Sequence, residues 1–220
     1  MSVFILVPVK EHGHAKSRMS AILSHRERME LAKTMFEDVA RALAGLTVPV
    51  VVVTNSHEAA RRAKALGWRV LWETQQISES HSVDAASLRL REEGAEAVLR
   101  LPADLPLVTA SDLELVLSNR LPAPFVVLVP SADRMGTNAV LRSPPDLFPS
   151  RFGHNSLVLH IQEASRRQAQ VRTLEIPNMA LDIDSVCDLR LFLQRPSSTL
   201  TYELLTQMSI SERLECGDSG

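Results

Sequence analysis

The chain has 220 residues, of which 45% are hydrophobic and 23% are charged, and its formal net charge at pH 7 is -2. This composition argues against intrinsic disorder, and a length below the roughly 250–300 residues at which cores stop growing predicts one sizeable domain. A nearly neutral chain also argues against a general nucleic-acid-binding protein, which usually carries a basic face.

The sequence carries no sign of secretion or of membrane insertion. Its apolar opening, residues 1–10, is too short to span a bilayer and lacks the basic start and the cleavage site of a signal peptide. Cys187 and Cys216 are too few for a disulfide framework and lack the spacing of metal ligands. We therefore expect a cytoplasmic protein with no membrane partner.

Short valine-rich runs alternate with longer amphipathic stretches, which is typical of crossover helices packed on a mostly parallel sheet. The pattern predicts an α/β protein with strands at 3–9, 48–53, 68–72, 97–101, 125–129 and 171–176. A capping box, Ser24 with Glu27, predicts a helix that ends at Gly45. Similar signals predict helices over 56–67 and 80–94 and helix starts at Ser111 and Ser185.

Residues 130–155 interrupt this alternation with four prolines and two glycines, which predicts an irregular excursion or a small antiparallel insertion. After Pro196 one short helical pattern precedes a polar end. We therefore assign a single domain to residues 1–195 and a tail to residues 196–220. A homodimer that forms through the excursion or the tail is compatible with the sequence.

Ligands of doubly wound sheets bind at the carboxyl ends of the strands. After the first predicted strand come Lys10, Lys16, Ser17 and Arg18, with Gly13 to bend the loop. A loop with these positive charges could wrap a polyphosphate, although it does not match the Walker pattern of P-loop NTPases. The alternative is that they are ordinary solvated side chains.

Three aspartates are candidate ligands for magnesium. Asp104 lies between two prolines at the end of a predicted strand, where a carboxylate can bind a hard cation or cap a turn. Asp182 and Asp184 alternate with apolar residues, so in a strand both emerge on one face, and their repulsion favours a cation between them. Asp184 also precedes Ser185, a candidate helix cap, which offers it a structural role instead.

The glycines of the excursion predict a second anion site. Gly136 and Gly153 permit tight turns whose N–H groups can face an anion. A helix that begins at Asn155 or Ser156 brings His160 onto the same face one turn later. An ordinary core histidine is the alternative for His160.

Six stretches of the sequence, taken together and in this order, resemble the phospholactate guanylyltransferase family, which takes part in making the deazaflavin coenzyme F420. Each stretch alone is a weak signal, whereas the ordered set is specific, and it extends from about residue 3 to residue 193. The stretches are "VPVKEHGHAKSRM", "ERMELAKTMFEDVARAL", "LPADLPLV", "GTNAVLRSPP", "FGHNSLVLH" and "LDIDSVCDL".

The resemblance implies a GT-A-like nucleotidyltransferase fold, which is a Rossmann-type sheet with helices on both faces. It implies transfer of GMP from GTP to the phosphate of 2-phospholactate, phosphoenolpyruvate or 3-phosphoglycerate, with release of pyrophosphate. It also implies that Asp104 and one or both of Asp182 and Asp184 hold Mg²⁺.

The remaining candidate residues divide between two roles. Lys10, Lys16 and Arg18 are expected to assist at the phosphates of the nucleotide, with Ser17 beside them. The "GTN" and "FGHNS" stretches are expected to hold the acceptor. These acceptor residues are Gly136, Thr137, Asn138, Gly153, Ser156 and His160.

The sequence departs from the family at two places. Met135 stands where a second glycine usually precedes "GTN", and "SHSVDAAS" at 80–87 lacks the usual asparagine, in a segment that lies near the nucleotide in the family. The base and the acceptor therefore stay open. The alternatives are another GT-A-type nucleotidyltransferase, whose usual glycine-rich first loop is missing here, and a non-catalytic nucleotide-binding homologue.

Overall fold

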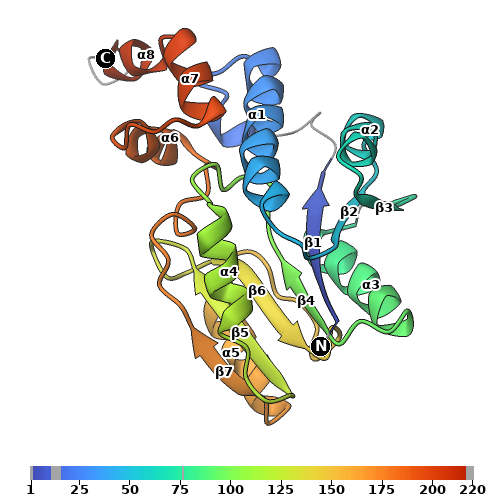
Figure 1. Ribbon diagram of the computed structural model, residues 1–220. Helices are drawn as coiled ribbons and strands as arrows, with labels where there is room; N and C mark the ends of the chain where they lie inside the picture. Colours follow the sequence, from blue (N-terminus) through green and yellow to red (C-terminus); the bar gives the residue numbers. More distant parts are fainter. Residues whose placement is uncertain (1, 11–15, 76, 217–220) are drawn as a thin grey trace.

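One mixed sheet of seven strands organises the described part of the chain, which comprises residues 2–10, 16–75 and 77–216. This computed structural model orders the strands β3-β2-β1-β4-β6-β5-β7 (Figure 1). The strands are β1 (Val3–Val9), β2 (Val50–Thr54), β3 (Arg69–Trp72), β4 (Ala97–Arg100), β5 (Phe125–Pro130), β6 (Thr137–Ser143) and β7 (Gln170–Thr173).

The helices begin mostly where side chains can cap them. A capping box of Ser24 and Glu27 starts α1, as predicted, and Ser185 caps α6 in the same way. The prediction for α4 is wrong by two residues, because Thr109 rather than Ser111 accepts the N–H of the first turn. The helices are α1 (His25–Ala44), α2 (His57–Ala65), α3 (Glu79–Glu92), α4 (Ala110–Ser118), α5 (Ser156–Arg166), α6 (Val186–Leu193), α7 (Leu200–Gln207) and α8 (Ile210–Cys216), with a short 3-10 helix, η2 (Ser17–Met19).

Alternation along the strands puts a helical layer on each face of the sheet. In β1, Ile5 and Val7 pack in the cluster that contains residues of α1, α2 and α4, whereas Leu6 packs with Val83 and Leu90 of α3 on the opposite face. α5 covers the same face as α3, farther along, over β5 and β6. The expected α/β fold with helices on both faces is therefore confirmed.

The proline- and glycine-rich excursion contains the one strand that the sequence pattern did not single out. β6 lies between β4 and β5 and runs antiparallel to both. The excursion is thus an antiparallel insertion into an otherwise parallel sheet. An antiparallel strand starts at the edge where its parallel neighbours end, so the beginning of β6 lies near the carboxyl end of β4.

The tail forms two helices rather than one, and they dock on α1 (Figure 1). Leu205 of α7 and Ile210 of α8 are fully buried in a cluster that also contains side chains of α1 and α6. The carboxylate of Asp38 in α1 accepts the N–H groups of Leu200 and Thr201, each at 2.8 Å, and the Thr201 hydroxyl at 2.6 Å. No helix of the described residues is both long and apolar enough to cross a membrane.

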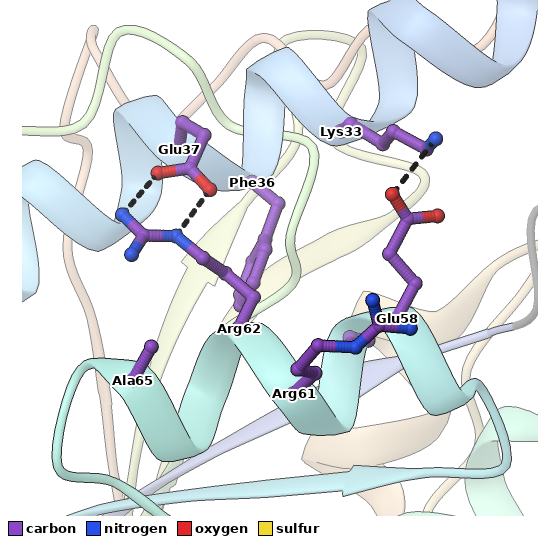
Figure 2. Close-up of a pocket in the computed structure, with 8 residues that line it drawn as sticks. Lys33, Phe36, Glu37, Glu58, Arg61, Arg62 and Ala65 are labelled. Atoms are coloured by element: carbon purple, nitrogen blue, oxygen red, sulfur yellow. Dashed lines mark hydrogen bonds and ion pairs between the residues drawn. The ribbon is translucent and has the colours of Figure 1, made fainter.

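A cavity of about 390 Å³ lies between α1 and α2 (Figure 2). Two ion pairs cross between these helices there: Arg62 Nε lies 2.6 Å from Glu37 Oε1, and Lys33 Nζ lies 2.9 Å from Glu58 Oε1. Phe36 lines the same cavity. None of its lining residues is a candidate site residue. This cavity between α1 and α2 is therefore separate from the site described below.

We expect Asp38→Ala to release the tail. The change leaves the partly buried N–H of Leu200 and the buried N–H and hydroxyl of Thr201 without their acceptor, which costs about 3 kcal/mol in the free energy of unfolding. Urea denaturation measures that loss, and limited proteolysis should cut near α7 first. Arg213→Gln, which removes an exposed ion pair between α8 and Glu27, is the control and should cost less than about 1 kcal/mol. An equal loss in both variants would contradict the anchoring role of Asp38.

Candidate active site

The ammonium group of Lys16 joins two aspartates from distant parts of the chain. Its Nζ donates to Oδ2 of Asp104 at 2.6 Å and to Oδ1 of Asp184 at 2.5 Å. The Lys16 side chain is 9% exposed, whereas that of Asp184 is 49% exposed. The group is therefore buried on the Lys16 side and open to solvent on the Asp184 side.

Burial and charge act in opposite directions on these groups. Burial would lower the pKa of Lys16, but the carboxylates of Asp104 and Asp184 raise it above its usual value. Burial would raise the pKa of Asp104, but Lys16 holds it below its usual value. Lys16 is therefore a permanent cation and cannot act as a general base.

Asp182 is the third carboxyl of the group, and within the described residues it forms no ion pair. Burial, together with the charges of Asp104 and Asp184, raises its pKa to about 6. Its Oδ1 accepts one hydrogen bond, from Nδ2 of Asn138 at 3.2 Å. The site thus holds more negative charge than Lys16 alone compensates.

Backbone contacts bring these carboxyls together. The N–H of Ile183 donates to the carbonyl of Asp104 at 3.3 Å, so the 181–184 segment lies beside the loop that follows β4. Leu181 and Ile183 are buried, and the two aspartates between and after them are only partly buried. The predicted alternation is present, although the segment is extended chain without ladder hydrogen bonds rather than a strand of the sheet.

The start of β6 lies next to the three aspartate carboxyls. Asn138 Nδ2 donates to the carbonyl of Met179 at 2.8 Å as well as to Asp182. Before it, the N–H of Gly136 donates to Ser131 Oγ at 2.7 Å, and a Cβ at position 136 would come within 2.8 Å of that oxygen. Only glycine allows this approach, which tightens the turn that leads into β6.

The Thr137 hydroxyl connects the candidate acceptor residues at the start of β6 with those of α5. Its Oγ1 accepts from Ser156 Oγ at 3.2 Å and lies 3.1 Å from Nδ1 of His160. Ser156 is the first residue of α5, as expected, and Gly153 in the preceding turn has a φ of +116°, which glycine adopts easily. His160 itself is 0% exposed, so it lies behind Thr137 rather than at a surface.

The remaining candidates lie around this group without joining it. Lys10 follows β1 and is exposed, and Ser17 and Arg18 are exposed in η2. Within the described residues none of the three forms an ion pair with the aspartates. Gly13, which was expected to bend this loop, lies outside the described residues.

Sequence reasoning missed Arg100, the last residue of β4. Its Nη1 donates to the carbonyls of Thr137 and Asn138 at 3.3 and 3.2 Å, and its guanidinium lies 4.2 Å from the ring centroid of Phe152. Its charge also contributes to the low pKa of Asp104. A lone arginine inside the buried strand "AVLRL" was the available signal, because a buried cation needs partners of its own.

The three aspartate carboxyls do not form a ready-made metal site. Within the described residues, no three His, Cys, Asp or Glu side chains are gathered closely enough to hold a metal ion as they stand. Lys16 instead bridges two of the carboxylates through Oδ2 of Asp104 and Oδ1 of Asp184, so the other oxygen of each carboxylate is not bonded to Lys16.

Known proteins resemble this chain over nearly its whole length. The family model described as "Guanylyl transferase CofC like" matches residues 3–219. A phosphoenolpyruvate guanylyltransferase of Rubrobacter xylanophilus is 40% identical over 190 residues, which cover 86% of this chain and 92% of the relative. A 3-phospho-D-glycerate guanylyltransferase of Colwellia psychrerythraea is 32% identical over 207 residues, which cover 93% and 97%.

A solved structure supports the fold independently. A protein of Desulfovibrio desulfuricans, assigned as a nucleotide-diphospho-sugar transferase, matches with a TM-score of 0.79 over 98% of this chain and 97% of its own, at 18% identity. An identity this low speaks for the fold alone. The family-model match over residues 3–219 and the relative that is 40% identical identify the chain as a member of the CofC-like guanylyl transferase family.

Proposed function

We propose that this protein transfers GMP from GTP to the phosphate of a three-carbon acid, releases pyrophosphate and takes part in coenzyme F420 biosynthesis. The observation that carries the proposal is the convergence of Asp104 and Asp184 on Lys16, beside Asp182. Among the acceptors, phosphoenolpyruvate is our first choice, because the relative that carries it in its name is 40% identical, against 32% for the 3-phosphoglycerate enzyme. 2-Phospholactate, which the family resemblance also implies, is the third acceptor.

The acceptor supplies its own nucleophile. The second pKa of a phosphate monoester is about 6, so at neutral pH the acceptor phosphate is mostly a dianion. No side chain has to remove a proton from it. This agrees with a site whose central cation, Lys16, stays protonated and whose buried histidine, His160, has its pKa lowered to about 3 by burial and by three nearby arginines.

The remaining difficulty is electrostatic, because a dianion must approach the α-phosphate of a polyanion. Lys16 provides a fixed positive charge, and we assign Lys10 and Arg18, whose side chains are exposed, to the nucleotide phosphates, with Ser17 beside them. On the acceptor side we assign the hydroxyls of Thr137 and Ser156, the Asn138 side chain, and the N–H groups of the turns at Gly136 and Gly153.

The chemistry of the carboxyls fits a divalent cation. Two aspartates already accept one cation, and the pKa of the third is raised by burial and by the charges of the other two, which Lys16 offsets only in part. Oxygen ligands of this kind are those that Mg²⁺ prefers. We propose that Asp104, Asp182 and Asp184 hold Mg²⁺, which when bound would offset the negative charge of the phosphate oxygens.

The proposed function is tested by incubating the protein with GTP, Mg²⁺ and each of the three acids in turn. We expect pyrophosphate release that depends on the acid and is fastest with phosphoenolpyruvate. GTP should exceed ATP and CTP as donor. Tight binding of GTP without release of pyrophosphate in the presence of any acid would favour a non-catalytic homologue.

Asp104→Asn should lower kcat by about two to three orders of magnitude, because it removes one preorganised charge from the site. The fold should persist, since Lys16 keeps Asp184 as a partner. Glu93→Gln, which also removes one carboxylate from an ion pair but lies at the end of α3, is the control and should leave kcat unchanged. Near-normal turnover of Asp104→Asn would overturn the assignment of this residue.

Asp182→Asn should stabilise the metal-free protein at high pH. Because the folded-state pKa of about 6 lies above the ordinary value of 3.8, ionised Asp182 disfavours the folded state above pH 6, and this penalty fades as the pH falls through 6 toward 3.8. A shift of about two units corresponds to at most about 3 kcal/mol. Thermal unfolding in EDTA at pH 8 and pH 5 measures the gain, which should be larger at pH 8.

Comparison with the wild type at each pH cancels the contribution of His160, which is common to both proteins. Addition of Mg²⁺ at pH 8 should raise the Tm of the wild type more than that of Asp182→Asn. Equal stabilisation of both proteins by Mg²⁺ would exclude Asp182 from the proposed ligands.

A further inference from the structure

Side chains of α3 hold the segment that leads into α5. Ser80 Oγ accepts the N–H of Phe152 at 3.1 Å. Asp84 accepts the N–H of Ser150 at 2.9 Å and its hydroxyl at 2.6 Å. Asp84 also accepts from the buried guanidinium of Arg142 in β6 at 3.0 Å. These two residues belong to 80–87, where the sequence departs from the family pattern.

The same segment then fixes His160. The N–H of Arg151, which lies between the two anchored residues, donates to Nε2 of His160 at 2.9 Å. The imidazole packs against Phe148 and Phe152, with ring centroids 5.8 and 5.0 Å away. Two aromatic neighbours and a hydrogen bond at Nε2 together fix the orientation of the ring.

That orientation decides what His160 presents to Thr137. Because Nε2 accepts a hydrogen bond, the proton of the neutral ring lies on Nδ1, which therefore donates to Thr137 Oγ1 at 3.1 Å. Thr137 Oγ1 also receives the hydroxyl of Ser156. A continuous set of hydrogen bonds thus runs from α3 through 150–152 and His160 to the two hydroxyls assigned to the acceptor.

We propose that Ser80, Asp84 and His160 are positioning residues that set the acceptor pocket, acting through the 150–152 segment and Thr137. This inference rests on the proposed function, because it takes Thr137 and Ser156 as acceptor contacts. Both ring nitrogens of His160 are engaged, by the N–H of Arg151 and by Thr137 Oγ1, so His160 acts through Thr137 and not by touching the substrate. The departure of 80–87 from the family pattern would then affect the binding of the acceptor as well as the binding of the nucleotide.

Ser80 is the best residue for a test. Loss of Asp84 would leave the buried cation of Arg142 without its carboxylate, and the fold could suffer. Within the described residues Ser80→Ala removes one acceptor, that of the Phe152 N–H, and Ser80→Thr keeps the hydroxyl. His160→Asn keeps a donor near the place of Nδ1 but cannot reach the N–H of Arg151.

Steady-state kinetics with GTP, Mg²⁺ and the most active acid give the readout. We expect Ser80→Ala and His160→Asn each to raise the KM of the acid by about three- to ten-fold, while kcat and the KM of GTP change less than about two-fold. Ser80→Thr should restore the KM. The double variant should raise the KM by less than the product of the two single effects, because both break the same set of hydrogen bonds.

Arg91→Gln is the matched control. It removes the ion pair with Asp146, which joins α3 to the same excursion but lies outside the set of hydrogen bonds. Its KM values should equal those of the wild type. An active wild type with unchanged acid KM in Ser80→Ala and His160→Asn, or with the GTP KM raised equally, would overturn this inference alone. A wild type that transfers GMP to none of the acids would overturn the proposed function, and the inference with it.

Discussion

Three aspartate carboxyls lie close enough to influence one another, and the ammonium group of Lys16 binds two of them and holds the pKa of Asp104 below its usual value despite burial. This contact links the loop after β1, the loop after β4 and the segment before α6. The third carboxyl, Asp182, has its pKa raised to about 6 by burial and by the charges of Asp104 and Asp184, which Lys16 offsets only in part. The site is therefore held in a state of incomplete neutralisation, which favours the binding of a further cation.

The antiparallel β6 brings the candidate acceptor residues Thr137 and Asn138 to the site. In a wholly parallel sheet the beginning of each strand lies at the edge opposite to the ligands. Because β6 runs the other way between β4 and β5, its first residues, Thr137 and Asn138, start near the edge where β4 ends. Asn138 then reaches Asp182, and Arg100 of β4 reaches back to the carbonyls of both residues.

Local patterns explain how much of the fold could be predicted. The apolar run of β1 at residues 3–9 and the capping boxes at Ser24 and Ser185 depend on neighbours within a few residues, and each was predicted correctly. Position 111 was misread as the cap of α4 because its spacing to an acidic residue matches that of Thr109 two residues earlier. β6 was missed as a strand because the residues that flank it, Gly136, Pro144 and Pro145, indicate turns and carry no information about which strands pair with it.

The sequence by itself determined the residue types of the site, the strand ends that carry them and the family to which they point. It could not determine that Lys16 lies between Asp104 and Asp184, that His160 stands behind Thr137, or that Arg100 and Arg142 are buried cations with partners. Those facts depend on contacts between residues that are far apart in the chain. Burial and the distance between charges, which set every pKa in the site, exist only after the strands have paired and the helices have packed on them.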